Sequence, residues 1–141
     1  MPTSPEDLKD LSLLGHPAQP SKKLEAFPNR SPGRFYKVTL TTDEFTCHCP
    51  ITHQPDFAKI TIEYAPDTKV VESKSLKLYF WSFRDEGVFH EHVANLMVDD
   101  LVALLDPHWI KVTGDFSVRG GIGIKVEAEH TKTPAARDAL R

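Results

Sequence analysis

The sequence lacks the features that mark several large classes of protein. Only two of its 141 residues are cysteine, and no apolar run approaches the roughly 20 residues that a membrane-spanning helix needs. Positive charge is not in excess, because 17 lysines and arginines stand against 20 acidic residues and leave a net charge of -3. A general nucleic-acid or membrane-surface binder would need a basic face. We therefore expect no nucleic-acid or membrane partner.

The start of the chain does not have a secretory layout. Pro2, Pro5, Glu6 and Asp7 stand within positions 1–10, where a basic segment and then an apolar one would be needed. Only one residue separates Cys47 from Cys49, so this pair is poorly placed to cross-link a fold. Both observations predict a protein of the reducing cytoplasm.

Apolar content and proline divide the chain into three parts. Hydrophobic residues make up 40% of the sequence, enough for the core of one domain. Six of the 11 prolines precede Arg34, which predicts a Pro-rich, partly ordered arm over residues 1–33. The domain is expected at 34–130 and a C-terminal tail at 131–141.

The periodicity of the central part predicts an α+β fold. One helix is expected from Ser73, as its N-cap, to about Glu86, where Gly87 would stop it. A second is expected from Phe89 to before Pro107, with an apolar stripe that includes Leu96. Alternating apolar and polar residues predict strands at 36–41, 58–64, 110–116 and 122–129, with a turn at Arg119-Gly120-Gly121. The order is ββααββ, an antiparallel sheet with both helices on one face.

Such a sheet leaves two long edges and a polar outer face. Long edge strands are usually paired or covered, because their unpaired backbone groups invite association. The pattern therefore favours several subunits joined in a ring or barrel.

One loop and one helix start carry candidate nucleophilic chemistry. Cys49 lies between the first two strands, in a loop that Pro50 and Pro55 stiffen, and Asp56 follows it closely. His90 and Glu91 open the second helix. A thiol near an acid and an imidazole is an arrangement used for nucleophilic catalysis, although a cysteine in a loop can also be structural.

Two other kinds of site stay open on these residues. The runs 47–49 and 90–92 offer thiol and imidazole ligands for zinc, but no Cys-x-x-Cys or His-Glu-x-x-His spacing occurs, and we predict no metal. Lys74 and Lys77 share a face near a helix N-terminus, which suits either a solvated basic face or a phosphate site to which Arg119 could contribute. No Gly-x-Gly-x-x-Gly occurs, which excludes a Rossmann site.

Four segments together resemble the QueF family, the NADPH-dependent 7-cyano-7-deazaguanine reductases, in its short, single-module form. They are ESKSLKLY (72–79), CPITHQPDFA (49–58), SFRDEGVFHE (82–91) and RGGIGI (119–124). The resemblance implies the tunnelling fold, in which pentamers stack into decamers with active sites between subunits. It also implies NADPH-dependent reduction of the nitrile to 7-aminomethyl-7-deazaguanine, a precursor of queuosine in transfer RNA.

The resemblance assigns roles residue by residue. Cys49 matches the nucleophile that forms a covalent thioimide, Asp56 the general acid, and His90 a histidine that assists proton transfer beside the substrate. The substrate contacts it implies are Val71, Glu72, Ser73, His90 and Glu91, and the cofactor-phosphate contacts are Lys74, Lys77 and Arg119.

Two residues depart from the family pattern. His53 stands where the family usually has glycine, and Cys47 is not a family requirement; it could be spare or form a reversible bond with Cys49. Two other functions are weighed: a zinc-dependent hydrolase of the GTP cyclohydrolase type, and a non-catalytic subunit that keeps the fold.

Overall fold

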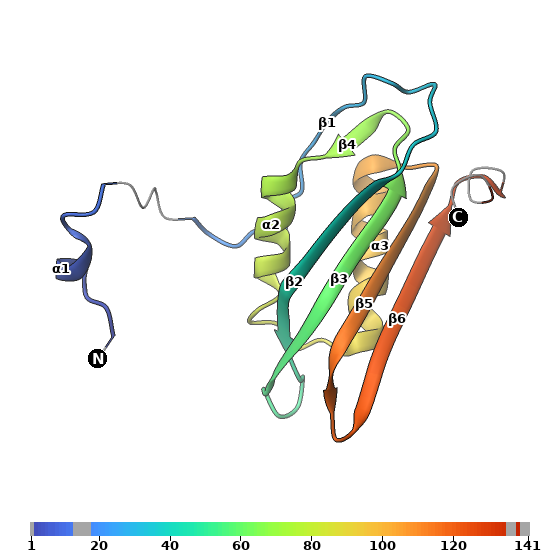
Figure 1. Cartoon of the computed structure of the whole chain (residues 1–141). Helices are drawn as coiled ribbons and strands as arrows, with labels where there is room; N and C mark the ends of the chain where they lie inside the picture. Colours follow the sequence, from blue (N-terminus) through green and yellow to red (C-terminus); the bar gives the residue numbers. More distant parts are fainter. Residues whose placement is uncertain (1, 13–17, 135–137, 139–141) are drawn as a thin grey trace.

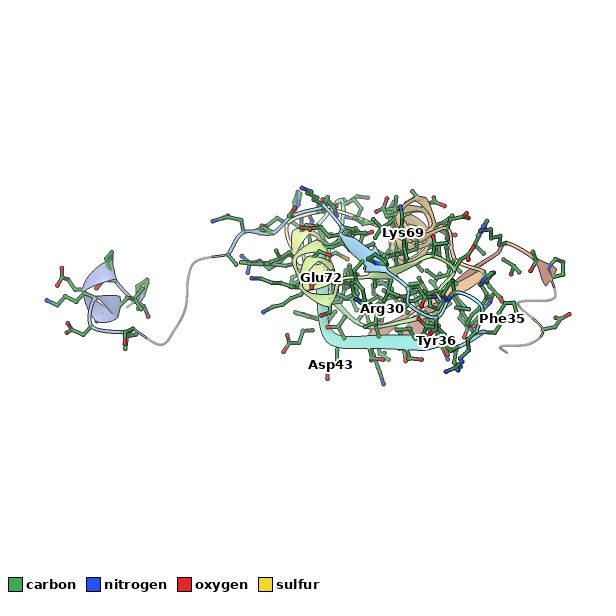
Figure 2. All side chains as sticks on the ribbon, turned by 90° about the horizontal axis from the view of Figure 1, so that it is seen from above. Arg30, Phe35, Tyr36, Asp43, Lys69 and Glu72 are labelled. Atoms are coloured by element: carbon green, nitrogen blue, oxygen red, sulfur yellow. The ribbon has the colours of Figure 1, made fainter. Side chains whose placement is uncertain are left out.

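The predicted ββααββ order is confirmed in a computed structural model, which describes residues 2–12, 18–134 and 138. A four-stranded antiparallel sheet carries two helices on one face (Figure 1). Seen end on, the sheet and the helices form two separate layers (Figure 2). Most of the predicted tail at 131–141 lies outside the described residues.

All four strands of this sheet are longer than the alternation alone predicts. They are β2 (Val38–His48), β3 (Pro55–Ala65), β5 (Trp109–Arg119) and β6 (Ile122–Thr131), in the order β2-β3-β5-β6. A bulge between Thr42 and Phe45 interrupts the register of β2, which then continues to His48. The alternation is lost at such a bulge because one strand gains residues that have no partner. Cys49 therefore follows β2 directly.

The two-residue turn between β5 and β6 is as predicted. Arg119 pairs with Ile122, and Gly120 and Gly121 have φ angles of 57° and 77°. Positive φ at both central positions is what a tight hairpin turn requires, and glycine adopts it without strain.

The first helix of the domain, α2 (Ser73–Ser82), is shorter than predicted and has a different cap. Glu72, not Ser73, is the N-cap: its carboxylate accepts hydrogen bonds from the backbone N–H groups of Lys74 and Ser75, both at 2.7 Å. The helix ends before residue 83 because the next amides bond carbonyls three residues back. Gly87 is therefore not its stop signal.

The second helix, α3 (His90–Leu105), closes the core against the sheet. Its inward side chains are buried with alternate residues of β3 and β5, among them Ile60, Ile62 and Val112. Leu96 departs from the prediction: it is 43% exposed, on the outer side of the helix. The rest of the stripe accounts for the packing of α3 on the sheet.

Three short elements were not predicted. They are α1 (Pro5–Leu8), β1 (Ala26–Pro28) and β4 (Lys69–Val71), and β1 pairs with β4 in a separate antiparallel sheet. Strands of three residues are too short for alternation to be visible in the sequence.

The end of the arm region lies along α2. Ser75 Oγ accepts a hydrogen bond from the backbone N–H of Glu25 at 3.0 Å. Lys22 Nζ lies 3.1 Å from the ring centroid of Phe83 and 3.2 Å from the Glu86 carboxylate. Within the described ranges, no helix is long and apolar enough to cross a membrane.

Candidate active site

Four predicted site residues meet at one end of the sheet. Cys49 begins the β2–β3 loop and Asp56 is the second residue of β3; His90 opens α3, and Arg119 is the last residue of β5. Antiparallel pairing brings the end of β5 beside the start of β3, and α3 begins at the same end (Figure 1). The topology thus collects residues that are up to 70 positions apart in the sequence.

Asp56 is at the centre of this group. Its side chain is only 7% exposed, with Oδ2 3.2 Å from His90 Nε2 and Oδ1 3.0 Å from Arg119 Nε. The His90 ring stacks on Phe116, with centroids 4.0 Å apart and planes 7° apart. A buried carboxyl requires partners of this kind, since an unpaired charge in such a place is costly.

The loop that carries Cys49 is closed by its own backbone. The Cys49 N–H donates to the Gln54 carbonyl at 2.9 Å, and the His53 N–H donates to the Cys49 carbonyl at 3.0 Å. His53 has a φ of 60°, the left-handed region in which a residue with a side chain is strained by about 1–2 kcal/mol.

A second segment, residues 86–88, holds the start of the loop that carries Cys49. The His48 N–H donates to the Glu86 carbonyl at 3.0 Å, and the Val88 N–H donates to the His48 carbonyl at 3.1 Å. A Cβ atom added at Gly87 would lie 2.9 Å from the Pro50 Cα. Gly87 was predicted only as a helix stop. In the structure, glycine is required at this position because two backbone segments approach closely.

The two cysteines, both free thiols, differ sharply in their electrostatic surroundings. The pKa of the Cys49 thiol is lowered, chiefly by the Thr52 hydroxyl and then by the backbone amides of Thr52 and Ile51. The pKa of Cys47 is raised to about 11, mainly by burial and then by the negative charges of Asp56 and Glu86. Only Cys49 therefore suits thiolate chemistry near neutral pH.

This difference predicts the pH dependence of thiol alkylation. Because its pKa is lowered, Cys49 should be alkylated by iodoacetamide at a lower pH than an ordinary cysteine, while Cys47 stays unmodified in the folded protein. Thr52→Val removes the hydroxyl and should move the Cys49 profile to higher pH. Peptide mass spectrometry across pH measures both thiols, and an unchanged profile in Thr52→Val would contradict the assignment.

The remaining predicted binding residues lie at the opposite end of the sheet. Val71 donates its N–H to the Tyr64 hydroxyl at 3.1 Å, and β3 from Asp56 to Tyr64 is roughly 26 Å long. Ser73, Lys74 and Lys77 begin α2 near that end, whereas Glu91 is exposed beside His90. One chain therefore brings together Cys49, Asp56, His90, Glu91 and Arg119, but not Val71, Glu72, Ser73, Lys74 and Lys77.

A groove runs along the edge strand β2 and α2. It has a volume of about 470 Å³ and is lined by residues of both elements, including Thr42, Ser73, Lys77 and Arg84. In the end-on view, Asp43 marks β2 in the sheet layer and Glu72 marks the start of α2 in the helix layer (Figure 2). The groove joins cationic groups to an apolar wall, which is a suitable surface for a phosphate-bearing ligand.

The described residues form no group of three or more His, Cys, Asp or Glu side chains that could hold a metal ion. Asp56 and His90 are already in contact with one another, and the Cys49 thiol interacts with Thr52.

A family match, named relatives and a solved structure agree on the proteins that this chain is similar to. The family described as QueF-like protein matches residues 55–135. An NADPH-dependent 7-cyano-7-deazaguanine reductase of Syntrophus aciditrophicus is 62% identical over 130 residues, 92% of this chain and 93% of that protein. One of the same name from Anaeromyxobacter dehalogenans strain 2CP-C is 58% identical over 119 residues, 84% of this chain and 98% of that protein. The apo crystal structure of the archaeosine synthase QueF-Like has a TM-score of 0.64 at 28% identity, covering 70% of this chain and 96% of that one.

The architecture and the solved relative define an α+β protein of the tunnelling-fold class, as predicted. Within that class, the family match and the 62% identity to the Syntrophus aciditrophicus reductase indicate the same family. The chain belongs to the QueF-like family.

Proposed function

We propose that this protein is an NADPH-dependent oxidoreductase that reduces the nitrile of 7-cyano-7-deazaguanine to the primary amine of 7-aminomethyl-7-deazaguanine, in queuosine biosynthesis. The names of relatives up to 62% identical support the reaction and its cofactor. One observation in this chain carries the proposal. A thiol of lowered pKa lies at the same end of the sheet as a buried carboxyl that contacts a histidine.

The proposed chemistry begins with covalent addition. The Cys49 thiolate attacks the nitrile carbon, so that an S–C bond forms and one C–N π bond breaks, and Asp56 gives a proton to nitrogen. The product is a thioimide on Cys49. His90, 3.2 Å from Asp56, can return a proton to the carboxylate.

Reduction of the thioimide needs two hydrides, which NADPH supplies in succession. After the first hydride reaches carbon, the C–S bond breaks, the Cys49 thiolate leaves and an imine remains. The second hydride adds to the imine carbon and the nitrogen takes up a proton, which gives the amine. A cysteine that bonds and then leaves must be stable as a thiolate, which agrees with the lowered pKa of Cys49.

The proposed binding residues fit the two ligands by charge. The Glu91 carboxylate can accept two N–H groups from the guanine-like edge of the substrate, with Val71, Glu72 and Ser73 against the same base. Lys74, Lys77 and Arg119 are proposed for the cofactor phosphates; Lys77 lines the 470 Å³ groove with Arg84. The Glu72 carboxylate already caps α2, and its backbone N–H and carbonyl are bonded to Glu25, Ser75 and Leu76. Contact with the substrate would therefore use the remaining acceptor capacity of the carboxylate.

Because these residues lie at opposite ends of the sheet, we propose that each complete site is formed by two copies of the chain. The chemical end of one copy, which carries Cys49, Asp56 and His90, would meet the binding end of its neighbour, which carries residues 71–77. The edge strands β2 and β6 each pair with one neighbour, and the outer edge of each pairs with no other described strand. These outer edges could join such copies in a homo-oligomer, with a decamer of two pentamers as the expected form.

The proposal is tested by mixing two defective variants. Cys49→Ala damages the chemical end and Lys74→Glu/Lys77→Glu damages the binding end, so each alone should fail to consume NADPH with the nitrile. Mixed oligomers should regain up to about a quarter of wild-type turnover, because that fraction of randomly paired sites has two intact halves.

The matched control mixes Cys49→Ala with Asp56→Asn, which damage the same end and should restore nothing. Failure of wild type to turn over the nitrile would overturn the proposed reaction. Turnover by wild type without restoration in the first mixture would overturn the two-chain site alone.

A further inference from the structure

All three nitrogen atoms of the Arg119 guanidinium contact residues 54–56, where the loop that carries Cys49 enters β3. Nε lies 3.0 Å from Asp56 Oδ1, and Nη1 donates to Gln54 Oε1 at 3.0 Å. Nη2 donates to the Pro55 carbonyl. Three neighbouring residues at the loop end and strand start thus share one planar cation, a geometry that lysine cannot reproduce.

The contact with Arg119 determines which oxygen of Asp56 faces His90. With Oδ1 held by Arg119, Oδ2 is the atom that faces His90 Nε2 at 3.2 Å. The stacking of His90 on Phe116 fixes the other side of that contact. A carboxyl held at one oxygen by a cation and at the other by an imidazole has a defined orientation for proton transfer.

We infer that Arg119 is a positioning residue for the acid step, acting through Asp56, in addition to any contact with the cofactor. This inference rests on the proposed function. When the Cys49 sulfur bonds to the nitrile carbon, Asp56 loses its proton to nitrogen and becomes a carboxylate. Arg119 is in place to stabilise that charge, while the stiffened loop keeps Cys49 and Asp56 in register.

A role of Arg119 in the acid step can be distinguished from a role in cofactor binding, because thioimide formation needs no hydride. The test is the rate of adduct formation on adding 7-cyano-7-deazaguanine to the full-length protein without NADPH, followed by intact-protein mass spectrometry. Arg119→Met should form the adduct about tenfold more slowly, part of the 10²- to 10⁴-fold that a positioned acid contributes. Arg119→Lys, which keeps the charge but loses the fork, should fall between Arg119→Met and wild type.

Rescue by the conservative variant gives a readout that a merely structural role would not move. His90 and Arg119 both contact the Asp56 carboxylate. At equal thermal stability, Arg119→Lys should form the adduct faster than Arg119→Met, because it restores a cation beside that carboxylate.

Three controls keep the outcomes distinct. Arg34→Met removes an exposed arginine from the β1–β2 loop and should leave the rate unchanged. In an Asp56→Asn background, Arg119→Met should have little further effect, since both act on one step. Thermal unfolding shows whether each variant is folded.

A wild-type rate of adduct formation in Arg119→Met without NADPH, with a raised KM for NADPH in turnover, would overturn the inference and leave Arg119 as a cofactor contact only. A full additional effect of Arg119→Met in the Asp56→Asn background would also overturn it. If wild type forms no adduct and does not turn over, the proposed function itself fails.

Discussion

Cys49→Ala is expected to abolish nitrile reduction, with a loss of at least about 10³-fold in kcat and no covalent adduct, because no other described thiol can replace the nucleophile. Cys47 is buried, and its pKa is raised to about 11, so it is neither accessible nor ionised near neutral pH. Cys49 is partly exposed and lies in a loop, outside the strands and helices, so its truncation should leave the fold intact. NADPH consumption and intact-protein mass spectrometry measure the two losses.

Cys47→Ala is the matched control, since it removes the neighbouring thiol and should retain both the adduct and turnover. It is buried in the core, so its thermal unfolding is measured in parallel. An active Cys49→Ala variant would exclude the thioimide route, whatever the other residues do.

Gly87→Ala is expected to lower kcat by roughly 10²-fold, although residue 87 is in no proposed catalytic contact, because small misplacements of reacting groups are costly. The added methyl group would meet the Pro50 Cα at 2.9 Å, and Pro50 follows Cys49 directly. That neighbour is backbone and cannot move aside as a flexible side chain would. The His48–Glu86 and His48–Val88 hydrogen bonds would be stretched together with the loop.

Gly33→Ala is the control for Gly87→Ala, since an added Cβ there meets nothing within 4 Å. Both variants are compared for kcat, for the alkylation rate of Cys49 and for thermal unfolding. Loss of activity together with altered Cys49 alkylation in a folded Gly87→Ala variant is the expected result. A folded Gly87→Ala enzyme with wild-type kcat would contradict the role given to this close approach.

The elements that the sequence predicted well are those with a sustained apolar period. Ile60 and Ile62 on β3, like Val112 on β5, are buried on one face as alternation requires. The cap of α2 was predicted at Ser73 because serine is a preferred N-cap residue and glutamate is not. Glu72 is the cap because its carboxylate accepts from the N–H groups of Lys74 and Ser75. The pairing of β1 with β4 was missed because it joins two short segments that are distant in sequence.

Much of the chemical end of the site could be predicted because its residues lie in short, distinctive motifs. The position of Arg119 could not, since its contacts with Gln54 and Asp56 depend on the register between β3 and β5. The structural role of Gly87 was equally invisible, because the partner that it approaches lies in a different motif. The separation of Val71–Ser73 from Cys49 follows only from the antiparallel topology, which places the start of α2 at the far end of β3.

The stoichiometry of NADPH consumption tests most directly whether the Cys49 site reduces a nitrile with two hydrides. A limiting amount of 7-cyano-7-deazaguanine is added to the wild-type protein with excess NADPH, and the oxidised cofactor and the amine are quantified together. We expect two NADPH oxidised for each amine formed, with no imine or aldehyde accumulating. No oxidation by a folded wild-type protein, or one NADPH per nitrile, would contradict it.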